Sequence, residues 1–557
     1  MIDDDALRAD IEKYPNLVRW FETCCQRYAD ASAFSCQGGT LTYAALNEHA
    51  SHFASWLQRS PHLRPGDRIA IHLPNLLQFP VAVFGALKAG LVVVNTNPLY
   101  DRDELKTQFV DAGVKAVVTL ANSAYLVEQV LPDTDIREVI VTQLADLHPF
   151  PKSAWINLQA RHIRKIVPRY KIPKAVSFTS CLKQGQKHPY RPVEIERHQL
   201  AFLQYTGGVT GISKGVMLTH HSVLANITQL KTVMNQVCVP EEEIAIAPLP
   251  LYHIYSFMLN GLLMVENGAH VVLIINPRDT EGFVKEISRW RFTLFSGLNT
   301  LFVDLCQNQD FCGLDFSNLK VTVSGAMSLT RFTEGLWTEI TGCPIQEGYG
   351  LTECSPVVAV HPPNETRRDD TVGPPVPLTE VKVVGTEGES LHPGEVGEIW
   401  VRGPQLMAGY WRQPELTRKT LREDGWLVTG DMGTLSDEGY IEVIDRKVEV
   451  IKTAGFDVYP SEVENLIACH PDVLECAVVG VPDDELGEVI KLFVVSRNRR
   501  LTVKAVREYC RERLTSYKVP KLVEFRAVLP KTNVGKVIRR QIREEEISKQ
   551  TKKRRHL

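Results

Sequence analysis

A glycine-rich segment offers the clearest chemistry in the sequence. Residues 205–215 hold four glycines, two threonines and Lys214, directly after an apolar run. Glycines let backbone N–H groups turn toward an anion, and hydroxyls and an ammonium group supply further donors. The segment therefore predicts phosphate binding, although Val216 breaks the Gly-Lys-Ser/Thr ending of a P-loop. A glycine-rich hairpin without a ligand is the alternative interpretation.

Single charged residues elsewhere carry no such signal by themselves. Taken alone, Glu353 is better explained as a surface carboxylate, Asp431 as a turn residue after Gly430, and Lys536 as a loop lysine after Gly535. His253 could be a satisfied core histidine as readily as a ligand-binding one.

Alternating strand and helix patterns must position these residues. Helical spacing covers 41–57 and 79–89, and short apolar runs at 68–72, 92–94 and 117–119 predict strands. This alternation favours parallel sheets covered on both faces. From about residue 372, strands expected at 381–384, 398–402 and 440–444 predict a small antiparallel β unit. Mixed α/β patterns return after residue 445.

Length and composition exclude several classes of protein. The 557 residues exceed one compact core, and about 100–200 residues per domain predicts three or more units. The net charge of −3 gives no field for nucleic acid, and no apolar run approaches about 20 residues. The acidic start lacks the features of a secretory signal or transit peptide. The 12 cysteines form no Cys-x-x-Cys pair, which favours a reducing cytoplasm over a disulfide framework or zinc site.

Five motifs in order give the sequence a family resemblance. They are the loop at 205–215, Gly348-Tyr349-Gly350-Leu351-Thr352-Glu353, Thr429-Gly430-Asp431, the segment 445–455, and Pro530-Lys531-Thr532-Asn533-Val534-Gly535-Lys536. Together they resemble the signatures of the adenylate-forming superfamily, which includes acyl-CoA synthetases, luciferases and peptide adenylation domains. The chain is most similar to the bacterial long-chain fatty-acid–CoA ligases.

The resemblance implies a fold and a domain division. The expected class is α/β, with a large N-terminal domain, residues 1–444, made of two α/β subdomains and a small β-barrel unit at about 372–444. A small, mobile α+β C-terminal domain, residues 445–557, is expected to carry Lys536 and a basic tail.

The resemblance also implies a reaction in two halves, with ATP and CoA as co-substrates and Mg²⁺ as cofactor. A fatty-acid carboxylate attacks the α-phosphorus of ATP, and the CoA thiol then displaces AMP. The implied catalytic residues are Lys536, Thr352 and Glu353, with Glu353 also the metal ligand. The implied ATP and AMP contacts are Thr206, Gly207, Gly208, Thr210, Gly211, Lys214, Gly325, Ala326, Tyr349, Gly350, Thr352, Asp431, Arg446 and Lys452. The implied acyl and CoA contacts are His253, Gly297, Leu298, Asn299 and Gly455.

Two positions depart from the family pattern. Val209 stands where the family has Thr, which removes one hydroxyl donor to phosphate. Val448 stands where relatives have Lys or Asp at the pivot between the domains. These departures are expected to affect the reaction rate and the balance between domain arrangements. The family's lysine, metal carboxylate and ribose aspartate are intact as Lys536, Glu353 and Asp431.

Residues 161–174 form an unusually basic stretch. Six Lys or Arg side chains occur there without an acid, interleaved with apolar residues. One interpretation is a solvated surface helix with a packed underside. The other is a peripheral contact with anionic lipid, worth about 1 kcal/mol per basic residue. A cytoplasmic protein that also binds the inner face of the membrane is the corresponding expectation.

Other functions stay open at this stage. An adenylating enzyme could deliver the acyl group to a carrier-protein thiol or stop at the acyl-adenylate, and a weakly catalytic paralogue could sense fatty acids. Acyl length cannot be derived from residues far apart in the sequence, and formation of a homodimer is equally open.

Overall fold

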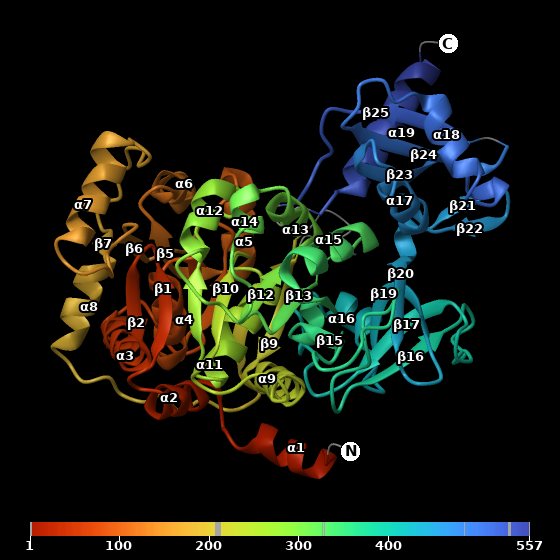
Figure 1. Cartoon of the computed structure of the whole chain (residues 1–557). Helices are drawn as coiled ribbons and strands as arrows, with labels where there is room; N and C mark the ends of the chain where they lie inside the picture. The colour runs from red at the N-terminus through yellow and green to blue at the C-terminus, as the bar shows by residue number, and fades with distance from the viewer. Residues whose placement is uncertain are drawn as a thin grey trace.

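The computed structural model describes residues 3–206, 213–325, 327, 329–483, 485–532 and 536–555. Four β-sheets organise this part of the chain. Figure 1 shows the N-terminal elements and the two large sheets on the left, the small β unit at lower right, and the C-terminal unit in blue above the end of β20.

The first eight-stranded sheet carries the predicted acyl and adenine residues on its strands or just after them. Its order is β15 (Val357–Val360), β14 (Ile345–Gly350), β13 (Val321–Ser324), β12 (Leu294–Gly297), β10 (Ile244–Ala247), β11 (His270–Leu273), β1 (Ser32–Cys36) and β2 (Gly39–Thr42). The six strands from β14 to β1 are parallel, and the two outer strands are antiparallel to their neighbours. The carboxyl ends of the parallel strands therefore share one edge.

The second eight-stranded sheet carries the glycine-rich segment. Its order is β18 (Gly409–Tyr410), β9 (Lys214–Thr219), β8 (Leu200–Thr206), β4 (Val92–Asn95), β3 (Arg68–His72), β5 (Val114–Leu120), β6 (Glu138–Thr142) and β7 (Val176–Ser177). The strands from β8 to β7 are parallel, whereas β9 is antiparallel to β8 and to β18. The predicted strands at 68–72, 92–94 and 117–119 are confirmed.

Helices pack between and around the two sheets. The longer ones in this part are α1 (Asp4–Glu12), α2 (Leu17–Arg27), α3 (Tyr43–Arg59), α4 (Gln78–Lys88), α5 (Arg102–Ala112), α6 (Ala124–Val130), α7 (Lys152–Leu158), α8 (Phe178–Gln186), α9 (His220–Met234), α12 (Thr280–Ile287), α13 (Asn299–Cys306) and α15 (Arg331–Thr341). The short ones are α10 (Ile254–Ser256), α11 (Met264–Glu266) and α14 (Gln309–Cys312), and a π-helical segment, Phe257–Leu263, joins α10 to α11.

The largest core cluster joins both sheets through α2, α3, α4 and α9. Every residue of α4 is buried, as its apolar sequence on all faces requires. The buried Lys88 is tolerated because its ammonium pairs with Glu22 at 2.6 Å. The helices predicted at 41–57 and 79–89 are confirmed as α3 and α4.

The β unit is a four-stranded antiparallel sheet. Its order is β16 (Glu380–Val384), β17 (Gly397–Arg402), β19 (Leu427–Leu435) and β20 (Ile441–Arg446), and α16 (Pro414–Thr420) precedes β19. The predicted strands at 381–384, 398–402 and 440–444 are confirmed. The expected barrel is wrong for the described residues, because the outer strands β16 and β20 do not pair and the sheet stays open.

The C-terminal unit is built on a second small sheet. Strands β22 (Phe456–Val458), β21 (Ile451–Thr453), β24 (Gly487–Ser496) and β23 (Val473–Asp483) are antiparallel, and β25 (Leu522–Phe525) joins β24 in parallel. Helices α17 (Pro460–Ala468), α18 (Val503–Arg511) and α19 (Arg539–Arg555) accompany the sheet. Its two core clusters contain only residues of this unit, so it is packed around its own interior.

The basic stretch is not the surface helix expected over 161–174. Helix α7 continues as a π-helical segment only to Ile163, and the chain is non-helical from there to Ala175. Pro168 and Pro173 explain this, because proline removes a helical donor and disfavours helix at the preceding residue.

Among the described residues, no helix combines the length and apolar character that crossing a bilayer requires.

Candidate active site

The candidate site follows the carboxyl ends of four neighbouring strands in the first sheet. His253 follows β10, Gly297 ends β12, Gly325 follows β13, and Tyr349 lies near the end of β14. The chain runs from β10 to β11 on one side and then to β12 on the other side of β10. Ligands of open α/β sheets bind at such a reversal of strand order. The fold therefore gathers residues that are about 100 positions apart in sequence.

The ends of the glycine-rich segment are fixed by strand pairing. Thr206 of β8 pairs with Lys214 of β9, and Ser213 Oγ donates to the Thr206 carbonyl at 3.1 Å. Gly207, Gly208, Thr210 and Gly211 lie outside the described residues, as does Val209. The flanking donors Thr206 and Lys214 are thus presented side by side at one end of a hairpin.

Asp431 is the centre of a buried polar cluster. The Tyr349 hydroxyl donates to Asp431 Oδ2 at 2.7 Å, and Arg446 Nε lies 2.7 Å from Oδ1. Burial, and then the Asp431 carboxylate, raises the pKa of Tyr349, so the hydroxyl stays a donor. Burial opposes the charge of Arg446, but Asp431, Tyr349, Glu353 and Glu449 together outweigh it and raise the pKa of that guanidinium. The register of the β19–β20 hairpin, with Asp431 opposite Arg446, makes this pair possible.

Glu353 is held by a residue that sequence patterns did not indicate. The Tyr410 hydroxyl donates to Glu353 Oε1 at 2.7 Å, and Met407 N donates to the Glu353 carbonyl at 2.8 Å. The Lys214 ammonium lies 5.3 Å from the centroid of the Tyr410 ring. Tyr410 therefore links the lysine of the glycine-rich segment to the predicted metal carboxylate. Thr352 precedes Glu353 in a 3₁₀ turn directly after β14.

Lys536 of the C-terminal unit faces this cluster. Lys536 is solvent-exposed as a residue, and neighbouring protein partly desolvates its amine. This desolvation, and then the Arg446 guanidinium, lowers the pKa of the Lys536 amine, whereas Asp431 favours its charged form. The structure thus brings a lysine more than 80 residues distant in sequence to the Asp431–Arg446 pair.

Glycine is required at two positions of the site. A Cβ on Gly350 would lie 2.1 Å from the Pro356 carbonyl oxygen, because β14 and β15 approach closely there. A Cβ on Gly325 would lie 3.1 Å from the ring of Tyr255, which covers that backbone. Tyr255 is a second residue that the motifs did not indicate, since its place follows only from the fold. Ala326 lies outside the described residues.

The predicted acyl residues lie beside the nucleotide residues. Burial lowers the pKa of His253 to about 4, so its imidazole is neutral at physiological pH. Gly297 packs against Phe302, Leu298 is buried, and Asn299 Oδ1 accepts from Thr330 N at 3.1 Å. The predicted Asn299 is therefore engaged in fixing the start of α15.

Two predicted residues lie apart from the cluster. The Lys452 ammonium pairs with Asp457 at 3.0 Å within the β21–β22 hairpin, and 77% of the side chain is exposed. Gly455 forms the turn of that hairpin with a φ of +82°. The structure does not bring either residue to Asp431.

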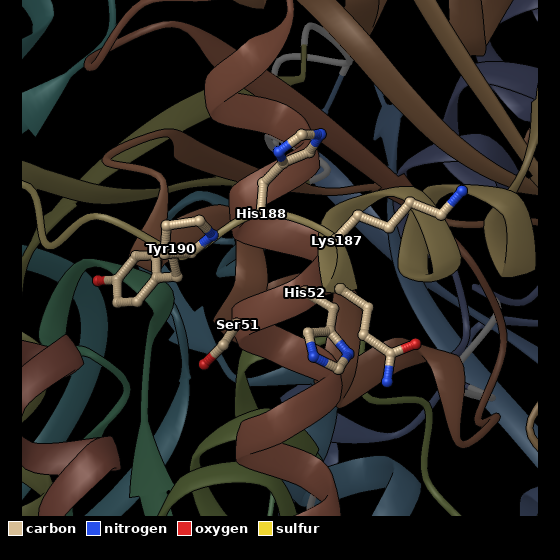
Figure 2. A pocket seen from close by; sticks show the side chains of 7 residues that line it. Ser51, His52, Lys187, His188 and Tyr190 are labelled. Carbon is tan, nitrogen blue, oxygen red and sulfur yellow. The ribbon is translucent and has the colours of Figure 1, made fainter.

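A separate surface pocket of about 410 Å³ lies between α3 and the segment after α8. It is lined by Ser51, His52, Gln186, Lys187, His188, Pro189 and Tyr190, none of which is a predicted site residue. Figure 2 shows the Lys187 and His188 side chains extending away from the His52 ring. The Lys187 and His188 side chains therefore do not converge with His52 on one point of the pocket.

Comparisons with known proteins agree with this arrangement. The chain is 44% identical to a long-chain-fatty-acid–CoA ligase of Yersinia pestis, over 97% of this chain and 96% of the relative. It is 36% identical to one of Bacillus subtilis, over 93% and 92%. Among solved structures, ATP-bound MatB from Rhodopseudomonas palustris superposes with a TM-score of 0.82 at 26% identity, over 96% of this chain and 99% of that one.

The same solved protein without ligand superposes less well. Apo MatB gives a TM-score of 0.72 at 25% identity, over 96% of this chain and 99% of that one.

Two family models cover most of the chain. The model described as AMP-binding enzyme matches residues 21–411, and the one described as AMP-binding enzyme C-terminal domain matches residues 462–536. Tyr349, Glu353 and Lys214 lie in the first region, and Lys536 is the last residue of the second. The chain belongs to the AMP-binding enzyme family.

Proposed function

We propose that this protein is an AMP-forming long-chain fatty-acid–CoA ligase. It activates a fatty acid with ATP to an acyl-adenylate, releases pyrophosphate, and transfers the acyl group to CoA with release of AMP. The observation that carries this proposal is the 44% identity to ligases of that name over nearly the whole of both chains. The polar cluster at the strand ends supports it, because it unites the residues that such a reaction needs.

The first half-reaction must overcome repulsion between two anions. A carboxylate has to approach a triphosphate, so catalysis depends on position and on cations placed where charge accumulates. In this proposal Lys214 and Thr206, with Gly207, Gly208, Thr210 and Gly211, bind the terminal phosphates. Thr352 binds the α-phosphate.

The nucleoside is bound by the Asp431 cluster. Asp431 accepts the ribose hydroxyls, and Arg446 supports both the ribose and the phosphate side. Tyr349, Gly350, Gly325 and Ala326 bracket the adenine. Lys536 approaches from the C-terminal domain and bridges the fatty-acid carboxylate and the α-phosphate.

Glu353 fits a Mg²⁺ ion that arrives with the nucleotide. Tyr410 donates to one carboxylate oxygen, Oε1, which leaves Oε2 for a cation. Among the described residues, no group of three or more His, Cys, Asp or Glu side chains could hold a metal. Mg²⁺ commonly combines one or two carboxylates with substrate phosphates and water, which matches a single Glu353. When bound, the ion neutralises phosphate charge.

The remaining residues concern the acyl group and CoA. In this proposal His253, Gly297, Leu298 and Asn299 lie along the acyl side of the site, and Gly455 contacts CoA after the C-terminal domain has moved. Neutral His253 suits an apolar substrate, because a buried imidazolium would be costly beside an alkyl chain.

A membrane-facing surface would supply this insoluble substrate. Phe150 is 84% exposed, Trp155 60% and Ile163 61%, and no side chain of α7 is buried. The basic stretch 161–174 follows directly and is exposed at most of its positions. Aromatic and apolar groups beside basic groups suit the interface of an anionic bilayer. We therefore place a peripheral contact with the inner face of the cytoplasmic membrane here.

The proposed reaction is tested by ATP–pyrophosphate exchange and CoA-thioester formation across saturated acids of C8 to C18. We expect both activities to require the fatty acid and to be greatest at the long end of the series. Exchange at background with every acid would contradict the enzyme assignment. Thioester formation with acyl carrier protein but not with CoA would contradict the proposal that CoA is the acceptor.

The role of Tyr410 is tested by Tyr410→Phe, which removes one hydrogen bond to Glu353. A hydrogen bond to a charged group contributes about 1.5–3 kcal/mol, so the Mg²⁺ concentration at half-maximal adenylation should rise by about 10- to 100-fold. Mg²⁺ titrations of pyrophosphate release measure this. The matched control is Tyr440→Phe, whose hydroxyl bonds Glu365 at an exposed site. An unchanged Mg²⁺ requirement in Tyr410→Phe would show that Glu353 needs no such support.

The membrane contact is tested by replacing Arg164, Lys165 and Arg169 with Gln. Binding to vesicles rich in phosphatidylglycerol should weaken, and wild-type binding should fall at high salt, where the Debye length shortens from about 10 Å at 0.1 M to about 3 Å at 1 M. Co-sedimentation measures both effects. Replacing the exposed Arg497, Arg499 and Arg500 of the C-terminal unit removes equal charge elsewhere and should leave binding unchanged. An equal loss of vesicle binding in the two triple variants would show that this surface is not the membrane contact.

A further inference from the structure

One side chain of the C-terminal unit is bound by groups from three segments of the chain. Arg539, the first residue of α19, donates from Nε to Glu464 Oε1 at 2.9 Å and from Nη2 to Ser461 Oγ at 2.7 Å. Its Nη1 donates to Asp445 Oδ1 at 2.8 Å and also pairs with Glu449. Burial opposes the charge, but the three carboxylates, Glu464 first, outweigh it and raise the pKa of the guanidinium.

Asp445 belongs to the β unit and not to the C-terminal unit. It lies in β20, opposite Met432 of β19, and its side chain is 2% exposed. Besides Arg539, its carboxylate accepts from the backbone N of Ser461 at 2.7 Å through Oδ2. Both carboxylate oxygens therefore receive donors from helices of the C-terminal unit, one from α17 and one from α19.

Residues 447–449 connect the β unit to the C-terminal unit, and their contacts change from the first unit to the second at a single residue. Lys447 pairs with Glu398 of β17 at 3.0 Å, whereas Glu449 pairs with Arg539 of α19. Val448 lies between them and is 57% exposed. A rotation of the C-terminal unit about Val448 would keep Asp445 with β20 and carry Arg539 and Ser461 away. Such a rotation would break the bonds that Arg539 and Ser461 donate to Asp445, whereas the bond from Arg446 N to Asp445 Oδ1 would remain.

The same guanidinium lies three residues after Lys536. Arg539 and Glu449 act on the Lys536 amine electrostatically, as do Asp431 and Arg446. The segment that carries Lys536 is thus attached at Arg539, and the charges of Arg446 and Asp431 also act on the Lys536 amine.

We propose that Arg539 and Asp445 form a clasp that holds the C-terminal domain in the adenylation arrangement, with Arg539 as the positioning residue for Lys536. This inference rests on the proposed two-step function. The clasp closes for attack on the α-phosphorus and opens before CoA attacks, so its residues affect one half-reaction and not the other. Val448 carries no charge of its own, and the clasp supplies the preference for the first arrangement.

Arg539→Lys and Asp445→Asn test the clasp, since both keep roughly the size of the side chain and weaken the bond from Arg539 Nη1 to Asp445 Oδ1. Pyrophosphate release should fall by about 10- to 100-fold, the factor that accompanies loss of a charged hydrogen bond. Thioester formation from supplied acyl-adenylate should stay within about twofold of wild type. The double variant should be no slower than the slower single variant, because both changes remove one contact.

Arg543→Lys is the matched control. Arg543 lies one turn further along α19 and pairs with Glu488 within the C-terminal unit at 2.6 Å, so both half-reactions should stay at the wild-type level. Thermal midpoints of all variants report folding. Equal losses in both half-reactions, no loss in either, or additive losses in the double variant would overturn the clasp. An inactive wild type and an inactive Arg543→Lys would instead refute the proposed function.

Discussion

The Asp431 carboxylate is the constraint on which the arrangement of the site depends. Its two oxygens bind the Tyr349 hydroxyl from the first sheet and the Arg446 guanidinium at the end of β20. Two parts of the molecule meet there, because β14 contributes Tyr349 and the β unit contributes Asp431 and Arg446. A buried carboxylate would be costly alone, and its two charge-assisted partners make it stable. The proposed ribose side of the nucleotide site is fixed by the same contacts that join the β unit to the sheet.

Cations and carboxylates alternate along the path from phosphate to ribose. Lys214 lies over Tyr410, Tyr410 supports Glu353, Arg446 pairs with Asp431, and Lys536 faces that pair. Each cation is held in place before the nucleotide arrives, so little reorganisation is needed as charge develops on the phosphorus. The Lys536 ammonium differs from the others, since its domain is attached through the Asp445 and Arg539 contacts. In such a site the Lys536 ammonium can leave with its domain while Lys214, Glu353, Arg446 and Asp431 stay in place.

Local sequence patterns predicted the elements well and the contacts between elements poorly. The strands at 68–72 and 92–94 and the helix at 79–89 follow from apolar periodicity, which acts within one segment. The pairing of β18 with β9 places Tyr410 beside Glu353, yet these residues are 57 positions apart and no periodicity relates them. The open β unit and the irregular backbone after Ile163 depended on strand pairing and on two prolines, and both differed from expectation.

The candidate site was predictable to the extent that its motifs are contiguous. Tyr349, Glu353 and Asp431 stand in short motifs, and the fold brings two of them within one hydrogen bond of each other. Lys452 stands in a motif as well, but the β21–β22 hairpin directs its ammonium to Asp457. Arg539 follows a motif without belonging to it, and its importance appears only when its four partners are seen together.

In the proposed mechanism, Lys536 supplies the charge for the first half-reaction from a domain that then moves away. Lys536→Ala tests it when pyrophosphate release and thioester formation from supplied acyl-adenylate are measured separately in one preparation. Loss of one preorganised group typically lowers a rate by about 10²–10³-fold, so pyrophosphate release should fall by that factor while thioester formation is largely spared. Equal losses in both steps would contradict the account, because Lys536 would then serve the site in a single arrangement.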